Sequence, residues 1–244
     1  MNSRHLTPQD IAEVVKRMHR ADILNEFEHT RRYLENLLAL KGHAEQAAAK
    51  AILDRSEAQG LTADEYFLAL DESAYMHQQA FPKIFYYSIL MHLCSVIEIK
   101  MIMLADKLHV SRKSSKSLAD YLAENPSKDE MRDRISKYIT EVTGINIKNT
   151  QKWATLNDVF QLRNIIAHAG GVLNSARASQ KTIDNISRIV FQYEQHGNIE
   201  VKYGPYLSTG WIIIELSSEI CQFFISEMKA YFEEAMDRLG APFG

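Results

Sequence analysis

The stretch WATLNDVFQLRNIIAHAGG, residues 153–171, decides how this chain folds and raises the question of what it does. On a helical wheel of 100° per residue, one half of the segment is apolar. That half consists of Trp153, Leu156, Val159, Phe160, Leu162 and Ile166. Arg163 falls near its middle, and Asn164 and His168 lie together at its edge. The pattern predicts a helix over about 149–169 that ends at the two glycines.

A cation in the middle of an apolar stripe needs an explanation, because burying an unpaired charge costs several kcal/mol. One explanation is a structural ion pair between Arg163 and Glu98, the only acid between Glu72 and Asp106. The other is an anion site. Arginine offers a planar, permanently charged fork for phosphate, histidine exchanges protons near neutral pH, and asparagine can orient either group. The three side chains together at a helix end favour a functional site.

The composition predicts an all-α protein with a minor β hairpin. The chain has 244 residues, is 46% hydrophobic, and contains only 10 Gly and 5 Pro. We expect long amphipathic helices within residues 9–58, where Gly42 is a candidate break, and a Thr62–Glu65 capping box at the start of the next helix. Further helices are expected over 82–106, 117–123, 127–142, 179–196 and 210–239, with a polar loop over 106–117 and a β hairpin over 197–210. Around Gly60 we place a boundary between an N-terminal helical extension, residues 1–60, and a helical domain, residues 62–240.

The most apolar stretch, residues 84–104, is long enough to suggest a transmembrane helix. It contains His92, Glu98 and Lys100, and each central charge would cost roughly 2.5–3.5 kcal/mol to insert. We therefore expect a helix buried in a protein core and no membrane association. The N-terminus has no apolar run typical of a signal peptide, so a cytoplasmic location is expected. Cys94 and Cys221 lie in apolar helical patterns and predict two buried thiols.

The sequence LRNIIAHAGG resembles the signature of the HEPN superfamily, whose ribonuclease members carry an Arg, four to six residues and then a His. Here Arg163 is followed by four residues and His168, with Asn164 as the polar residue after the Arg. The resemblance covers roughly residues 62–239 and implies a HEPN-like helical bundle. It also implies a homodimeric, metal-independent RNA endonuclease that leaves a 2′,3′-cyclic phosphate. His168 would be the acid–base group, Arg163 would stabilise charge, and Asn164 would orient them.

Other polar groups could support this motif. The helix over 82–106 carries Ser88, His92 and Ser95 on one line, with Glu98 at its edge. These residues are either satisfied polar groups of the core or a layer that faces the Arg163 helix. The loop 107–116 holds Arg112, Lys113 and Lys116 and no acid. It is either a solvated loop or a contact to the RNA backbone.

Partners and cofactors follow from the same residues. No HxxxH, CxxC or DxD motif is present, so no metal or other cofactor is expected. The net charge of −3 requires any RNA site to be local. The first interpretation is therefore an RNA-cleaving toxin or phage-defence effector, with a protein antitoxin or regulator as a further partner. The alternative is a non-catalytic HEPN-like scaffold that binds a protein or a nucleotide, with Arg163 merely paired to Glu98.

Overall fold

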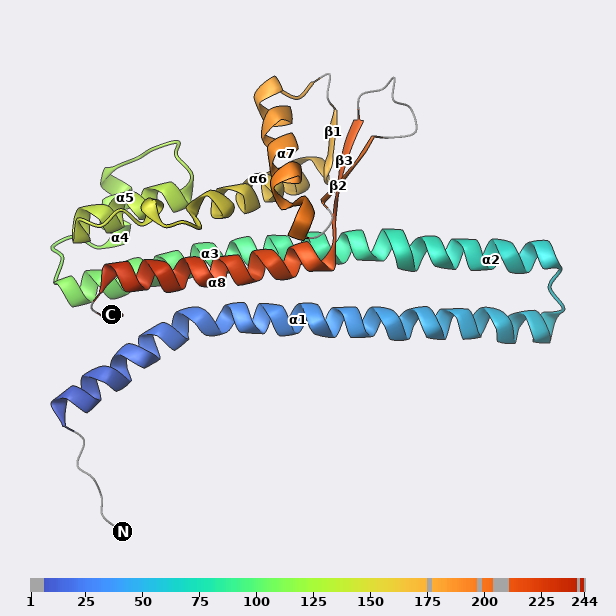
Figure 1. The fold of residues 1–244 in the computed structure, drawn as a ribbon, viewed down its shortest axis with the longest axis horizontal. Coiled ribbons are helices and arrows are strands. Elements are labelled where there is room, and N and C mark those ends of the chain that lie inside the picture. Colours follow the sequence, from blue (N-terminus) through green and yellow to red (C-terminus); the bar gives the residue numbers. More distant parts are fainter. Residues whose placement is uncertain (1–6, 175–176, 197–198, 204–210, 241, 244) are drawn as a thin grey trace, which may run out of the picture. The chain divides into compact units, whose positions relative to one another are not determined.

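The computed structural model describes residues 7–174, 177–196, 199–203, 211–240 and 242–243. Within these residues the expected all-α class is confirmed, with one small antiparallel sheet (Figure 1). The helices are α1 Pro8–Gln59, α2 Ala63–Tyr75, η1 Met76–Ala80, α3 Phe81–Arg112, α4 Leu118–Glu124, α5 Met131–Thr143, η2 Ile147–Asn149, α6 Trp153–Ala169, α7 Gln180–Tyr193, η3 Glu194–His196 and α8 Ser218–Leu239. The strands are β1 Val172–Asn174, β2 Ile199–Tyr203 and β3 Trp211–Leu216.

The chain forms two compact units, and each is assembled from separate segments of the sequence. The first unit comprises Met1–His29, Leu93–Phe160 and Phe224–Gly244. The second unit comprises Thr30–His92 and Gln161–Phe223. The turn at Gly60–Thr62 separates α1 from α2 inside the second unit, and the boundary expected there stays a prediction.

The first unit has a core of long helices. Phe27 of α1 packs against Phe232 of α8 with ring centroids 5.3 Å apart. The ammonium group of Lys100 in α3 donates to the carbonyl of Asp22 at 2.8 Å, which ties α1 to α3. Residues of α5 and α6 complete this core, and the buried members are Ile135, Tyr138, Ile139, Leu156, Val159 and Phe160.

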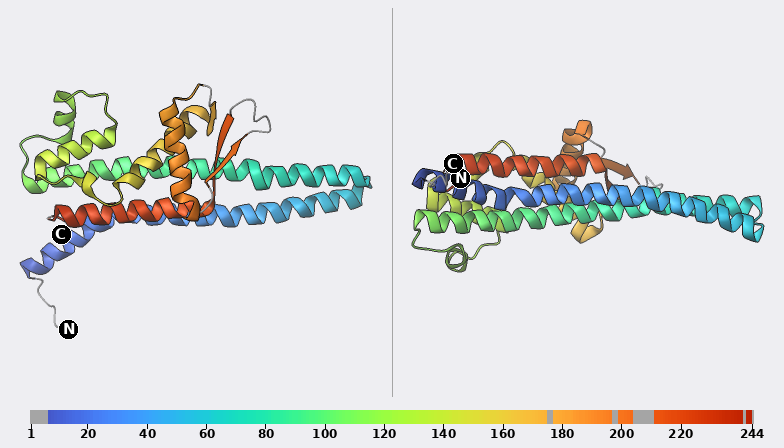
Figure 2. Two further views of the ribbon diagram at one scale, coloured as in Figure 1. Left: turned by 45° about the horizontal axis from the view of Figure 1, so that its top comes forward. Right: turned by 90° about the horizontal axis from the view of Figure 1, so that it is seen from below.

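The second unit contains the sheet, the end of α6, α7 and a helical hairpin. The strand order is β1–β3–β2, and both pairings are antiparallel. Helix α7 lies beside this sheet (Figure 1). The part of α1 after His29 and α2 run side by side and are joined by the turn at Gly60 (Figure 2). The expected capping box is confirmed, because the Thr62 side chain accepts from the Glu65 amide and the Glu65 carboxylate accepts from the Thr62 amide.

Two helix boundaries expected from the sequence were wrong. Helix α1 continues through Gly42, where the cost of glycine, about 1 kcal/mol relative to alanine, is small beside that of breaking a helix of 52 residues. Helix α3 continues to Arg112, so only the end of the expected 106–117 loop is a loop. The helix persists because Leu104 and Leu108, four residues apart, are both fully buried and carry the apolar face past the expected end.

The sheet was predicted only in part. The expected hairpin contains β2, whereas residues 204–210 lie outside the described residues. The last helix was expected from residue 210, but β3 occupies Trp211–Leu216 and α8 begins at Ser218. A short apolar run such as WIIIEL fits a strand or a buried helix equally well, and its pairing with β1 and β2 decides for the strand.

The buried hydroxyl of Tyr231 and the buried thiol of Cys221 predict a loss of stability at alkaline pH. Burial raises the pKa of the Cys221 thiol to about 12, with a smaller contribution from Glu219, and burial raises the pKa of Tyr231. The folded protein therefore keeps protons that the unfolded chain loses above about pH 9–10. The contribution of these two groups to the free energy of unfolding should be constant below that range and then fall as the pH rises, by up to about 1.4 kcal/mol per pH unit for each group.

Urea unfolding at several pH values between 8 and 11.5 measures this loss. The Tyr231→Phe variant removes a buried hydroxyl that has no hydrogen-bond partner among the described residues, so it should flatten the decline above pH 10. Tyr75→Phe, at an exposed tyrosine of α2, is the matched control and should keep the wild-type slope. An undiminished slope in Tyr231→Phe would contradict the assignment.

Candidate functional site

Helix α6 places the Arg163 motif as its wheel predicts. The residues of the apolar half are buried: Trp153, Leu156, Val159, Phe160, Leu162 and Ile166. Arg163 and Asn164 are half-buried, and His168 is exposed in the last turn.

The guanidinium group of Arg163 is bound on one side only. Its Nη1 donates to the Asn164 Oδ1 at 3.0 Å. Its Nε is buried and has no hydrogen-bond partner among the described residues. Within the described part of the second unit, no carboxylate pairs with Arg163. Glu98 belongs to the first unit, so the alternative of an Arg163–Glu98 pair stays untested.

The end of α6 is fixed by two left-handed glycines and a tyrosine. Gly170 and Gly171 have φ values of +59° and +75°, a conformation that strongly favours glycine. A Cβ atom on Gly171 would lie 1.9 Å from the hydroxyl oxygen of Tyr87. That hydroxyl donates to the carbonyl of Ile214, and the Ile214 amide donates to the Gly171 carbonyl at 2.8 Å. Tyr87, Gly171 and β3 therefore fix the backbone just after the end of α6, and Gly171 lies three residues after His168.

Sequence reasoning did not identify Tyr87. Burial, with a smaller contribution from Glu215, raises the pKa of Tyr87 to about 12, so the hydroxyl remains a donor at neutral pH. Tyr87 lies on α3, far from Gly171 in the sequence, and only the fold brings the two together. The signal that could have suggested such a contact is the second glycine, because one glycine is enough to end a helix.

The groups expected to support the motif lie on α3 and differ in exposure. Ser88, His92 and Ser95 are exposed, so the interpretation of these residues as buried core groups is wrong. The His92 ring contacts Tyr33 of α1 edge-on, with centroids 6.4 Å apart. Glu98 is half-buried. Whether Glu98, His92 and Ser95 act on Arg163 stays a prediction.

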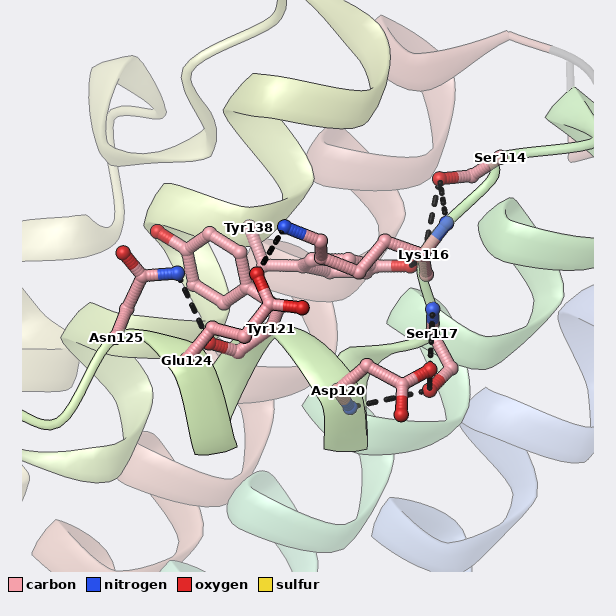
Figure 3. Close-up of polar contacts among 8 residues, drawn as sticks. All are labelled: Ser114, Lys116, Ser117, Asp120, Tyr121, Glu124, Asn125 and Tyr138. Carbon is pink, nitrogen blue, oxygen red and sulfur yellow. Dashed lines mark hydrogen bonds and ion pairs between the residues drawn. The ribbon is translucent and has the colours of Figure 1, made fainter.

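The three basic residues expected to contact RNA gather at the turn between α3 and α4, in the first unit. The turn is held on α5, since the Lys116 carbonyl accepts from the hydroxyl of Tyr138 at 2.9 Å and from that of Ser114 at 3.1 Å (Figure 3). The Lys116 ammonium group pairs with Glu124 at 2.5 Å, and the Ser117 hydroxyl caps α4. A cavity of about 320 Å³ beside the turn is lined by Arg112, Ser114, Ser115, Lys116, Tyr138, Glu141 and Val142.

The cations of this turn are not equivalent. Arg112 donates through Nη2 to the carbonyl of Leu239 at 3.1 Å and so satisfies the end of α8. The Lys116 charge is balanced by Glu124, and this hydrogen bond raises the Lys116 pKa. Lys113 is exposed and has no such structural contact within the described residues. It is therefore the residue of this turn best placed for an external anion.

Lys113 also occupies a position that suits glycine better. Its φ is +50°, and it is the only non-glycine residue with positive φ in the described part of the chain. The amides of Lys113 and Ser114 donate to Val110 and His109 at 3.3 and 3.1 Å, which is the Schellman arrangement that ends α3. A left-handed conformation costs a non-glycine residue roughly 1–2 kcal/mol. Retention of such strain points to a role for the side chain.

Lys113→Gly is expected to stabilise the protein by about 1 kcal/mol and to weaken RNA binding at the same time. Loss of one phosphate contact should reduce the slope of log Kd against log salt by about one. Urea unfolding and filter binding at several salt concentrations measure the two effects. Lys181→Ala, an exposed lysine of α7, is the control for charge. An unchanged salt slope in Lys113→Gly would remove this turn from the RNA footprint.

Two further features bear on cofactors and membranes. Among the described residues, no group of three or more His, Cys, Asp or Glu side chains could hold a metal ion. Helix α3 is long and apolar enough to cross a membrane by length and composition alone, and 56% of its most apolar window is buried in the protein. A core helix of a soluble protein passes the same test, so the expected absence of membrane association stays a prediction. The expected burial of the Cys94 and Cys221 thiols is confirmed.

Comparison with known proteins gives no relative. No protein-family model, no curated protein and no solved structure matches the chain.

Proposed function

We propose that this chain is a metal-independent RNA endonuclease of the HEPN type. The observation that carries the proposal is the state of Arg163, a half-buried guanidinium that forms no ion pair within the described residues of its unit and is bound by Asn164. Five residues later the exposed imidazole of His168 stands at the helix end. Cleavage of a phosphodiester requires both a charge that is left available and an exposed acid–base group.

The reaction uses the nucleophile that RNA supplies. His168 accepts the proton of the 2′-hydroxyl as its oxygen attacks the adjacent phosphorus, and the bond between phosphorus and the 5′-oxygen breaks. A proton returns to the 5′-oxygen, which leaves a 2′,3′-cyclic phosphate and a 5′-hydroxyl. Arg163 stabilises the charge on the pentavalent phosphorus, and Asn164 orients the guanidinium through their 3.0 Å hydrogen bond.

A homodimer belongs to the same proposal. On an ideal helix Arg163 and His168 are about 140° apart, so one helix does not direct both at a single phosphate. A second copy of α6 would supply the missing group. Lys113, with Arg112 and Lys116 at the same turn, would contact the RNA backbone and contribute to affinity and not to the chemical step. We place such an enzyme in the cytoplasm, as a toxin or phage-defence effector under the control of a protein regulator.

Cleavage of total RNA in EDTA tests the proposal. The wild-type protein should produce fragments that a 2′,3′-cyclic-phosphate-dependent ligation captures and that kinase treatment labels at the 5′-hydroxyl. His168→Ala should be inactive, whereas His43→Ala, at an exposed histidine of α1, should be fully active. Equal cleavage by wild type and His168→Ala would contradict the proposal.

The second candidate is a non-catalytic HEPN-like scaffold that binds a protein or a nucleotide. The observation that favours it is the large exposed apolar surface of the second unit, which catalysis does not use. Inactivity of the wild type on RNA together with a strong loss of stability in Arg163→Ala would support the scaffold.

A further inference from the structure

The α1–α2 hairpin, residues 35–77 of the second unit, lacks a core of its own. From Glu35 to His77, a stretch that is described throughout, no residue is buried. Helix α2 buries none of its 13 residues. Helices in proteins owe most of their stability to the packing of an apolar face, and two helices whose residues are at most half-buried receive little of that support. A surface of this kind is expected to be covered by something else.

The uncovered residues are large and apolar. Phe67, Leu68 and Tyr75 of α2 are 65%, 61% and 57% exposed. Met76, Leu40 and Leu53 extend the apolar surface of the hairpin. Single exposed apolar residues are ordinary, whereas several on one short helix mark an interaction surface.

The negative charge of the hairpin indicates which class of molecule could bind to it. Residues 35–77 carry eight Asp/Glu and three Lys/Arg, a net charge of −5, while the whole chain carries −3. The remainder of the chain is therefore net positive by two. Helix α2 alone holds Asp64, Glu65, Asp71 and Glu72 and neither lysine nor arginine. Such a surface repels nucleic acid and anionic lipid, and two α2 helices of different copies would repel each other.

The hairpin also contains a pocket that could accept a side chain of a partner. A cavity of about 180 Å³ between α1 and α2 is lined by Glu45, Ala49, Leu70, Ser73, Ala74 and His77. Its size is comparable to that of apolar cavities of about 150 Å³ that take up benzene. Most of the lining residues are small or apolar, and Glu45 adds a carboxylate to the lining. An apolar side chain flanked by a basic one fits this lining.

We propose that the α1–α2 hairpin docks a basic amphipathic helix of a partner protein. The apolar face of that helix covers Phe67, Leu68 and Tyr75, and its basic flank meets Asp71 and Glu72. In this binding mode a helix packs on a helical surface through apolar side chains at positions i, i+3 and i+4. The surface uses none of the residues of the Arg163 motif, so this proposal does not depend on RNA cleavage.

The probe is a labelled synthetic 18-residue helix with leucine on one face and lysine on the other. The fluorescence anisotropy of this peptide should rise when the full chain is added, and the affinity should fall as the salt concentration increases. A peptide of the same composition in scrambled order, without an apolar face, should bind at least tenfold more weakly. Phe67→Ser/Leu68→Ser should reduce affinity at least tenfold, and Asp71→Lys/Glu72→Lys should reduce it about fivefold and remove most of the salt dependence.

Matched controls lie on α7 in the same unit. Phe191→Ser, at an 82% exposed phenylalanine, and Asp184→Lys should bind as the wild type does. If the double serine variant loses helicity by circular dichroism, Phe67→Ser alone replaces it. Equal binding of the two peptides, or unchanged binding by the α2 variants, would overturn the proposal. Self-association of the wild type that Phe67→Ser/Leu68→Ser abolishes would overturn it in favour of a second copy as the occupant.

Discussion

Arg163→Ala is expected to abolish RNA cleavage and to leave the melting temperature nearly unchanged. Loss of a group that stabilises transition-state charge costs about 10²–10³-fold in rate. Little packing is lost, because the side chain is only half-buried and its one hydrogen bond is to the neighbouring Asn164. Single-turnover cleavage and thermal unfolding of the same preparation measure the two quantities. Arg32→Ala, at an exposed arginine of α1, is the matched control and should change neither.

The structural alternative predicts the opposite pattern. If Arg163 is the buried partner of Glu98, Arg163→Ala strands a carboxylate and should destabilise the fold by roughly 3–5 kcal/mol. Arg163→Lys separates the two cases further, because lysine keeps the charge and loses the planar fork. A catalytic arginine makes this variant stable and nearly inactive. A stable and fully active Arg163→Ala protein would end the assignment of this residue to catalysis.

Gly171→Ala is expected to be the most destabilising single substitution near the motif. The left-handed conformation, φ +75°, costs alanine roughly 1–2 kcal/mol. The new Cβ also collides with the Tyr87 hydroxyl and with two ring carbons at 2.6 and 2.9 Å, and such overpacking costs roughly 1–3 kcal/mol more. The ring cannot move aside freely, because its hydroxyl is bonded to the carbonyl of Ile214. The free energy of unfolding from urea titration should therefore fall by roughly 2–5 kcal/mol.

Gly170→Ala supplies the control from the adjacent residue. Gly170 has a similar φ of +59°, but nothing lies within 4 Å of its added Cβ. This variant should lose only the conformational term, roughly 1–2 kcal/mol. In a Tyr87→Ala background, the cost of Gly171→Ala should fall to that of Gly170→Ala, which a double-mutant cycle measures. Equal costs for the two glycines in the wild-type background would show that the Tyr87 contact is unimportant.

Short-range sequence patterns predicted most of the helices. The features that they did not predict depend on contacts between residues far apart in the sequence. The spacing of apolar residues placed α6, and the sequence T-x-x-E placed the start of α2, because both signals lie within a few residues. Strand β3 was missed because its identity depends on partners at Val172–Asn174 and Ile199–Tyr203. The end of α3 was predicted too early because the many polar residues near position 110 suggested a loop, although Leu108 is buried.

The candidate site was likewise predictable only in part. The residue types at Arg163, Asn164 and His168, and their place at a helix end, were readable from the sequence. The contact of Tyr87 with Gly171 was not, because the two residues meet only through the tertiary fold. The basic residues 112–116 looked alike in sequence. Their bonds to Leu239 and Glu124 distinguish Arg112 and Lys116 from the exposed Lys113.

The division of each unit among separate segments has a consequence for how the chain matures. The first unit combines Met1–His29 with Phe224–Gly244, two segments that lie far apart in the sequence. During synthesis, at about 5–20 residues per second, its core cannot close until the last helix has left the ribosome. Phe27 of α1 stays without its partner Phe232 until α8 has been made. Removal of α8 would therefore leave the first part of α1 without the helix that completes its core.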